Sequence, residues 1–551
     1  TPRIWIARLS DSSVTKVPRS NSSDSNPMWV GSHVYFLSDR AGPATLFDYD
    51  TASGKLAQLV ANDGYPIDAA SAGAGAIVYT QMGELHLVDL ASGKNSVVPV
   101  TIDGPLPQTV PYFKKVAKEI EHWGISATGA RAVFEAHGDI FTVPADKGDV
   151  RDITRTENAA ERDPAWSPDG KSVAYFSDAS GEYALTIRDQ DGLKAPRKID
   201  LGQPPSFFYS PRWSPDGKRI AYSDKRLNLW VVDLADAKPV KVDTDLFDTP
   251  LHEFDQAWSP DSRWIVYTKQ LANHLHAVFV YSLDTRKATQ ITDGMSDTLY
   301  PVFDANGKYL YFTASTDNGL SPGWLDMTSQ AHPVTRGVYV AVLRKNLPSP
   351  LAPESDEDKG VTAPAADKSD DGNSKKEKAE DKSGSGADSV AIDFDGLLQR
   401  TLALPIPPAN FAGMSAGKTG ELYLLEAPQV AGEDDAATLK RFDLKKRKVE
   451  SLADGVTAFA LSADGSKMLL RTGKENWAIA AADKPAKPGE GKIDVAAMEV
   501  HVQPRAEWTQ MYNEVWRIER DFFYDPHFHG LDITAAEKHF RPYLAGVGSR
   551  G

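Results

Sequence analysis

One ten-residue stretch decides the fold of this chain: Trp166-Ser167-Pro168-Asp169-Gly170-Lys171-Ser172-Val173-Ala174-Tyr175. Its first half returns 47 residues later as Trp213-Ser214-Pro215-Asp216-Gly217, and after a further 45 residues as Trp258-Ser259-Pro260-Asp261-Ser262. Pro sets φ for a tight turn, Asp bonds to the turn backbone, and Gly accepts a positive φ, while the residues that follow are strand formers. Four short strands in roughly 45 residues predict one blade of a β-propeller.

The composition excludes several classes of protein. A chain of 551 residues is too long for one hydrophobic core, so two or more domains are expected. The net charge of −15 argues against a nucleic-acid surface, and no nucleic-acid partner is expected. The absence of cysteine excludes disulfides, thiolate metal sites and a cysteine nucleophile. No apolar run approaches the ~18 residues that a membrane span needs, so no span is expected.

Residues 1–116 hold blade-like units of a weaker kind. Asn26-Pro27-Met28-Trp29-Val30-Gly31 takes the place of the aromatic turn, and His33–Asp39 follows as a strand. With the strand that begins at Ile4, the segment holds two full units and part of a third. A ring needs about four to eight blades, so we expect these units to end a first propeller whose earlier blades precede Thr1.

Residues 117–503 hold a longer series of the same unit. The residues that start the turns are Ile125, Trp166, Trp213, Trp258, Phe303, Met414 and Leu461. One long gap in this series contains residues 353–388, which have no aromatic side chain, 11 acidic residues and 6 basic residues. Such a segment buries too little surface to fold, so it is predicted to be a disordered acidic insertion. Seven units remain, which predicts a seven-bladed propeller.

The periodicity changes at residue 504, where a helical pattern begins. Asp525-Pro526 is predicted to stop the first helix, and Thr534-Ala535-Ala536-Glu537 fits a capping box for a second one. We expect residues 504–551 to open a helical subdomain that continues beyond Gly551. The apolar residues at spacings of 3 and 4 are Trp508, Met511, Val515, Ile518 and Phe522.

Two short motifs look like signatures of enzymes but are assigned to blade turns. Gly413-Met414-Ser415-Ala416-Gly417 has the G-x-S-x-G spacing of a nucleophile elbow, which requires a strand, a sharp turn and then a helix. A strand-like run, Glu421–Leu425, follows instead. Gly417-Lys418-Thr419 lacks the first glycine of a P-loop, because Ala412 stands at that position.

The histidines do not form a recognisable metal site. His527 and His529 are spaced at i and i+2, but no third ligand accompanies them. His274 and His276 alternate along a strand-like stretch, where they would line one face. A structural role is favoured for both pairs, so no metal and no cofactor are predicted.

The serines of the repeated turns are interpreted as structural. Ser167, Ser214 and Ser259 occupy the same place in successive units, whereas an enzyme needs a single nucleophile.

Two segments resemble a known family. The matching residues are Pro111–Phe113, Phe134–Ala145, Ser180–Tyr183, Arg188–Gly192, Glu507, Trp508, Met511, Glu514, Trp516, Asp521, Phe522, Tyr524–Pro526 and His529–Gly530. Together they resemble the tricorn protease family and its bacterial homologues, which are serine peptidases like the tail-specific proteases. The resemblance implies an all-β fold of β-propellers: residues 1–116 end a six-bladed propeller, 117–503 form a complete seven-bladed one, and 504–551 are the truncated helical start of an α/β catalytic subdomain.

The same resemblance implies a function. Members of the family degrade oligopeptides to short peptides, and their propellers gate substrate access and product exit. Their catalytic Ser, His and Glu lie C-terminal to the position of Gly551, so no catalytic residue is assigned in this chain. Their substrate-anchoring basic residues fall before Thr1, so no substrate-binding residue is assigned either. The implied partners are oligopeptides, further copies in a homo-hexamer and downstream aminopeptidases, and the implied location is the cytoplasm, with the periplasm as the alternative.

Two other classes share parts of the pattern. A TolB-like propeller would act in protein interaction without catalysis, but it would not append the helical segment 505–551. An enzyme of the prolyl-oligopeptidase type would continue into an α/β-hydrolase with a true nucleophile elbow, rather than into a helix at Trp508–Phe522.

Overall fold

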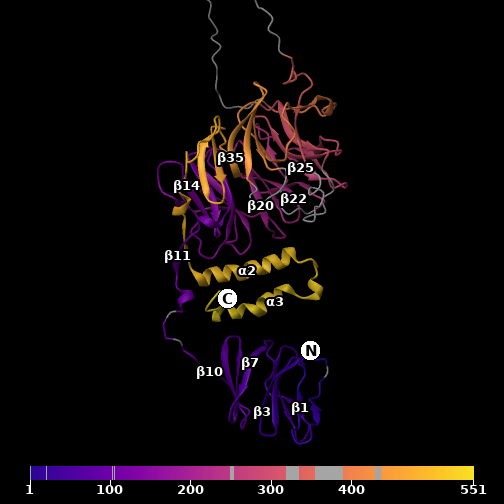
Figure 1. Cartoon of the computed structure of the whole chain (residues 1–551), viewed down its shortest axis with the longest axis vertical. Helices are drawn as coiled ribbons and strands as arrows, with labels where there is room; N and C mark the ends of the chain where they lie inside the picture. Colours follow the sequence, from indigo (N-terminus) through magenta and orange to yellow (C-terminus); the bar gives the residue numbers. More distant parts are fainter. Residues whose placement is uncertain are drawn as a thin grey trace, which may run out of the picture. The chain divides into compact units, whose positions relative to one another are not determined.

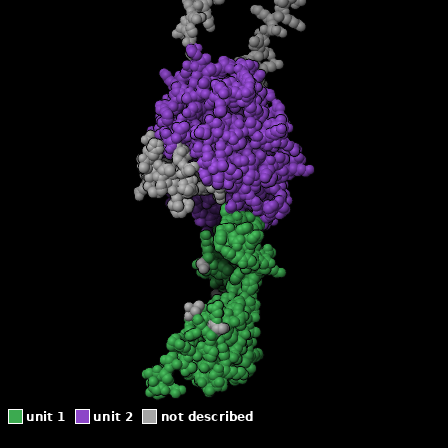
Figure 2. Space-filling model, turned by 90° about the vertical axis from the view of Figure 1, so that its right-hand side faces the viewer, with its two compact units in different colours: residues 1–111, 503–551 green, residues 112–502 purple. Residues whose placement is uncertain are grey.

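The computed structural model describes residues 2–19, 21–101, 103–104, 106–247, 254–317, 334–353, 389–428 and 436–550. It divides into two compact units, of which unit 1 is Thr1–Pro111 with Gln503–Gly551 and unit 2 is Tyr112–Val502 (Figure 2). The predicted acidic insertion, apart from its first residue, lies outside the described residues and stays a prediction.

Unit 1 combines small antiparallel sheets with helices. β1 pairs with β2, and two four-stranded sheets follow, in the orders β3-β4-β5-β6 and β10-β9-β8-β7. The two sheets share a buried core to which Leu46 contributes from the first and Ile77 from the second. The elements are β1 (Trp5–Ala7), β2 (Val14–Lys16), β3 (Asp24–Val30), β4 (His33–Ser38), β5 (Thr45–Asp50), β6 (Leu56–Gln58), β7 (Ile67–Ala72), β8 (Ala76–Gln81), β9 (Glu84–Asp89), β10 (Asn95–Val98), η1 (Pro107–Thr109), α2 (Pro504–Phe522), η6 (Phe528–Gly530), α3 (Ile533–Phe540) and η7 (Arg541–Gly546).

Unit 2 is a series of antiparallel sheets, drawn from purple to orange in Figure 1. Five have four strands each: β12–β15, β16–β19, β20–β23, β24–β27 and β28–β31. These strands are β12 (Ile120–Ile125), β13 (Arg131–Ala136), β14 (Asp139–Pro144), β15 (Arg151–Asp152), β16 (Glu161–Trp166), β17 (Ser172–Ser177), β18 (Ala184–Asp189), β19 (Arg197–Ile199), β20 (Phe208–Trp213), β21 (Arg219–Asp224), β22 (Asn228–Asp233), β23 (Pro239–Thr244), β24 (Ala257–Trp258), β25 (Trp264–Gln270), β26 (His276–Ser282), β27 (Lys287–Gln290), β28 (Asp297–Phe303), β29 (Tyr309–Ser315), β30 (Gly337–Val342) and β31 (Thr401–Ala403).

A six-stranded sheet then contains the last two repeats. Its strands are β32 (Phe411–Ala416), β33 (Glu421–Glu426), β34 (Ala437–Asp443), β35 (Lys448–Leu461), β36 (Lys467–Thr472) and β37 (Asn476–Ala481). The 14-residue β35 pairs with β34 through its first half and with β36 through its second, so it leads from one repeat into the next. The unit also has η2 (Ala117–Glu119), η4 (Leu398–Arg400), η5 (Val495–Ala497) and β38 (Glu499–Val502).

The ring of unit 2 closes between its first and last repeats. Phe134 of β13 and Trp477 of β37 share one buried core, and their rings meet edge to face. The Asp464 N–H donates to the Ala127 oxygen at 3.1 Å across the same junction. Outside the ring, β11 (Tyr112–Lys115) pairs with β38 and joins the two ends of the unit. The predicted β-propeller fold is confirmed.

The repeated turns are held together by the serines. The Ser167 hydroxyl donates to Asp169 Oδ1 at 2.7 Å and accepts from the Ser172 N–H at 2.9 Å. Ser214 and Ser259 each donate to the aspartate two residues later at 2.6 Å. These contacts confirm the structural interpretation of the three serines.

The turn-start aromatic residues pack between neighbouring sheets, as the repeat predicts. Trp213 joins a core that holds Phe176 of the preceding sheet and Ile220 of its own. Its Nε1–H also donates to the Ala165 oxygen at 3.1 Å, and the corresponding distance from Trp258 to the Arg212 oxygen is 3.0 Å. Each indole thus ties one sheet to the sheet before it.

The C-terminal segment is helical, as predicted, with one correction. Figure 1 shows α2 and α3 as an antiparallel pair. The cap of α3 is Asp532, whose side chain accepts from the Ala535 N–H, so the predicted capping box at Thr534 is wrong. Val515, Ile518 and Phe522 of α2 are exposed. Across the described residues, no helix has both the length and the apolar character required to cross a membrane.

Candidate functional site

The first strand of each sheet lies innermost in unit 2, because these strands contact one another from sheet to sheet. Most of them carry a β-bulge near their start. In three of these bulges the two extra residues are an X-Pro pair whose first residue has a positive φ: Asp163, Ser210 and Tyr300, at 55°, 50° and 56°. Asn26 in β3 of unit 1 repeats the pattern at 52°. Bulges of this kind redirect side chains and are frequent beside functional sites.

The bulge of β12 is built differently and carries a polar cluster. Its residues, Glu121 and His122, have no proline and no positive φ, and both lie opposite Glu135 of β13. The distance from His122 Nδ1 to Glu135 Oε2 is 2.8 Å, and that from His122 Nε2 to Asp163 Oδ1 is 3.3 Å. Glu135 Oε2 also accepts from the Asp163 N–H at 2.8 Å. The ring of His122 therefore lies between carboxylates of two neighbouring sheets.

The electrostatics of this cluster follow from burial and close charges. Burial lowers the pKa of His122, but the hydrogen bond with Glu135 and the charges of Asp163 and Glu135 outweigh it and raise that pKa to about 9. Burial raises the pKa of Asp163, and the His122 charge counteracts part of that effect. The imidazolium therefore compensates carboxylates that would otherwise be costly to bury.

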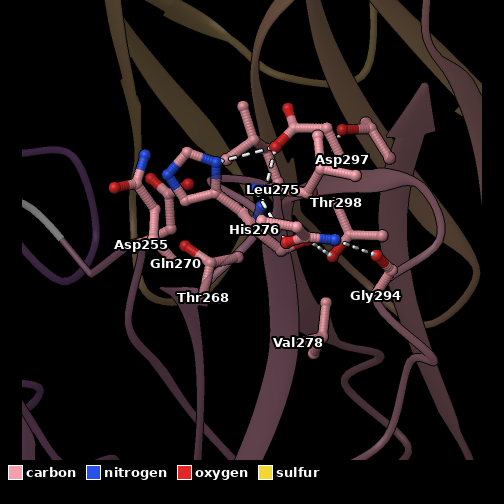
Figure 3. A network of polar contacts seen from close by, with 12 residues as sticks. Asp255, Thr268, Gln270, Leu275, His276, Val278, Gly294, Asp297 and Thr298 are labelled. Atoms are coloured by element: carbon pink, nitrogen blue, oxygen red, sulfur yellow. Dashed lines mark hydrogen bonds and ion pairs between the residues drawn. The ribbon is translucent and has the colours of Figure 1, made fainter. Parts of the chain in front are cut away.

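A second cluster joins the fourth and fifth sheets (Figure 3). His276 Nδ1 lies 2.7 Å from Asp297 Oδ1, and the His276 N–H donates to the same oxygen at 2.9 Å. Arg336 Nη2 donates to Asp297 Oδ2 at 2.5 Å. Burial raises the pKa of Asp297, but the His276 hydrogen bond and the Arg336 charge prevail and lower it to about 2. With every charge paired, the cluster acts as a structural lock.

A third cluster brings several buried carboxyl groups close to the Thr154 hydroxyl. Thr154 Oγ1 lies 3.1 Å from Asp139 Oδ1 and 3.3 Å from Asp152 Oδ1. Burial and the charge of Asp152 raise the pKa of Asp139 to about 7. Burial also raises the pKa of Glu161, whose Oε1 accepts from the Ser177 hydroxyl at 3.0 Å. These carboxyl groups hold protons more firmly than exposed ones do.

The serine and histidine motifs of the sequence lie at separate places in the structure. Ser415 lies within β32 and pairs with Tyr423 of β33, so its G-x-S-x-G motif forms a hairpin instead of a nucleophile elbow. His276 belongs to the lock with Asp297, whereas His274 packs against Phe247 at 4.1 Å between ring centroids. His529 follows α2, and its Nδ1 lies 3.2 Å from Asp525 Oδ2.

Sequence reasoning missed the cluster around His122. A signal was present in the sequence. Asp163, Ser210 and Tyr300 are each followed by proline, whereas Glu121-His122 stands at the corresponding place in the first repeat and has no proline.

Three family models match the chain in succession. The tricorn protease N-terminal β-propeller domain matches residues 1–94, the tricorn protease second β-propeller domain matches residues 120–482, and the tricorn protease C1 domain matches residues 504–551.

Curated relatives match nearly the whole chain. Tricorn protease homolog 1 of Streptomyces coelicolor is 25% identical over 99% of this chain and 51% of its own length. The Tricorn protease homolog of Saccharolobus solfataricus is 23% identical over 95% of this chain and 46% of its own length. The chain thus spans about half the length of these relatives.

A solved structure agrees at the level of the fold. The crystal structure of the tricorn protease superposes with a TM-score of 0.74 and 18% identity, covering 100% of this chain and 50% of that one. Because the second-propeller model alone covers more than half of the sequence, this chain belongs to the tricorn protease family.

Proposed function

We propose that this chain is the propeller portion of a tricorn-like serine peptidase that degrades oligopeptides to short peptides. The observation that carries the proposal is the ordered match to the two propeller domains and the C1 domain, over residues 1–94, 120–482 and 504–551. In this proposal the catalytic Ser, His and Glu come from sequence C-terminal to Gly551. The motif at Ser415 then takes no part in catalysis.

The propellers act as the gate for substrate and product. The closed ring of unit 2 supports this role, because its innermost strands surround an axis. In this proposal an extended peptide passes along that axis. The junction at Ala127 and Asp464 completes the ring. Such a gate would discriminate by width, so it would admit unfolded peptides and exclude folded proteins. The proposal extends to a homo-hexamer, to aminopeptidases that consume the short products, and to a cytoplasmic location.

The test compares the full-length product with this 551-residue chain on fluorogenic tri- and tetrapeptides, with and without a serine-directed inhibitor. Inhibitor-sensitive turnover is expected from the full-length product alone. Turnover by the short chain that Ser415→Ala abolishes would contradict the assignment of catalysis. A full-length product that is inert on peptides but binds a protein partner would favour a TolB-like interaction propeller instead.

Gating needs a separate experiment. Ala412 is an exposed bulge residue of the innermost strand β32. Ala412→Trp therefore adds bulk at an innermost strand without filling the core, and under the gating proposal it would narrow the passage. In the full-length protein this change is expected to slow cleavage of a roughly 20-residue peptide about tenfold or more and to leave tripeptides unaffected. Ala235→Trp, in the exposed turn between β22 and β23, is the matched control. Equal effects on long and short peptides would refute gating through unit 2.

A further inference from the structure

The bulge of β12 differs from the other bulges in the residue that lies opposite it on the partner strand. In the other two-residue bulges of innermost strands, the residue opposite the bulge is a buried aromatic one: Phe36, Tyr175, Tyr222 or Phe312. Opposite Glu121 and His122 stands Glu135, which is only 3% exposed. Burying a carboxylate in place of an aromatic side chain costs free energy, and such departures from a repeated pattern are expected at functional sites. This position is therefore a candidate for binding a ligand.

The geometry of the bulge brings three ligand-type side chains together. One oxygen of Glu121, one ring nitrogen of His122 and one oxygen of Glu135 all lie within 4.8 Å of one another. Two ligands of a tetrahedral zinc ion, each about 2.1 Å from the metal, are roughly 3.4 Å apart. His122 and Glu135 already meet at 2.8 Å, so an ion needs only a small outward turn of the exposed Glu121 and His122 side chains.

The surroundings match those of a histidine that ligates a metal. Such a histidine usually donates its second ring N–H to a carboxylate, and ligating carboxylates are themselves hydrogen-bonded. Here the second nitrogen of His122 faces Asp163 at 3.3 Å, and the Asp163 N–H donates to Glu135 Oε2 at 2.8 Å. Asp163 would therefore orient both ligands from the neighbouring sheet.

We propose that Glu121, His122 and Glu135 bind a divalent transition-metal ion of the zinc class, with Asp163 as the residue that positions them. An imidazole with two carboxylates suits zinc and its neighbours better than Mg²⁺ or Ca²⁺, which take oxygen ligands throughout. Three protein ligands leave one tetrahedral position for water or for a group of a passing peptide. The ion replaces the positive charge that a protonated His122 supplies, and all three of its ligands come from the first sheet.

The test is a zinc titration of the untagged, chelator-stripped protein in competition with a chromophoric chelator. One equivalent is expected to bind in the wild type. His122→Gln and Glu121→Gln are expected to weaken that binding at least tenfold, and Asp163→Asn about tenfold or more. The matched control is His33→Gln, because His33 meets the single carboxylate of Asp48 at 2.8 Å and should leave the titration unchanged.

A spectrum separates this site from binding elsewhere. Co²⁺ in the stripped protein should give the intense visible absorption of a four-coordinate ion, and that absorption should disappear in Glu121→Gln, a change at an exposed residue that leaves the core intact. The proposal is overturned if the wild type binds no stoichiometric zinc, or if the His122 and Glu121 variants bind it as the wild type does. Neither readout depends on peptidase activity, so the gating proposal stands or fails separately.

Discussion

Replacing Asp297 by asparagine should destabilise unit 2 more than any comparable change at its surface. Asp297 is 1% exposed, and its two carboxylate oxygens face His276 and Arg336. Arg336 is itself only 8% exposed, and its Nη1 donates to the Asp297 backbone oxygen at 3.0 Å. Asparagine retains the shape of the side chain but removes its charge, so a buried guanidinium loses its counter-ion.

The magnitude follows from the paired charges. The pKa of Asp297 falls from 3.8 to about 2, which corresponds to about 2 kcal/mol of stability contributed by the carboxylate. Breaking a buried pair by removing one partner costs about 3–5 kcal/mol, because the remaining charge is uncompensated. Since the folded-state pKa is depressed, this stability is fully present above pH 4 and is lost as the pH falls toward 2. Unit 2 has about 390 residues, so a loss of 3–5 kcal/mol lowers its Tm by roughly 4–6 °C.

Calorimetry of the wild type and Asp297→Asn at pH 7 and at decreasing pH measures this effect. Asp233→Asn is the matched control, since its partner Arg219 lies 3.1 Å away with both side chains about one-third exposed, and it should cost less than about 1 kcal/mol. The double variant Asp297→Asn/Arg336→Met should lose less than the sum of its single variants. A Tm for Asp297→Asn no lower than that of the control, or strictly additive single variants, would refute the reasoning.

Three further predictions rest on other parts of the chain. Trp213→Ala should lower the free energy of unfolding by about 3 kcal/mol or more, measured by calorimetry, because it leaves a cavity between two sheets. An unchanged Tm would show that the indole does not stabilise the packing of these sheets. Asp139→Asn should stabilise the protein, and the gain in free energy of unfolding over the wild type should grow by about 2–3 kcal/mol between pH 5 and pH 8. The reason is that the raised folded-state pKa of Asp139 makes the wild type lose stability as the pH rises toward 7. A Tm difference between variant and wild type that does not change with pH would contradict this. Ser415→Ala should leave the peptide turnover of the full-length product unchanged, and a loss of turnover would restore the nucleophile-elbow interpretation.

The repeats could be predicted because their signals are local. The Ser-Pro-Asp-Gly turn contains all the groups that close it, and Gly170 and Gly217 take the positive φ values of 72° and 70° that the motif requires. Packing of Trp213 between sheets follows from the same register.

The polar clusters could not be predicted in the same way. His122 meets Asp163 between two neighbouring sheets, and Asp297 meets Arg336 within the fifth sheet across 39 residues of sequence. The predicted start of α3 was wrong because Asp532 and Thr534 are both good capping residues and the helix uses the earlier one.

The pairing of β11 with β38 has a consequence for how the protein is made. Tyr112 and Val502 face each other across that pair, so the chain enters and leaves unit 2 at neighbouring points, and unit 1 is assembled from sequence on both sides of it. On the ribosome, the strands of unit 1 are synthesised first, but the helix contacts such as the one from the Tyr65 hydroxyl to the His539 oxygen must wait for the whole of unit 2 to be translated. Unit 2 is in effect an insertion between residues 111 and 503, so the two parts of unit 1 come together only after the whole propeller ring has been made.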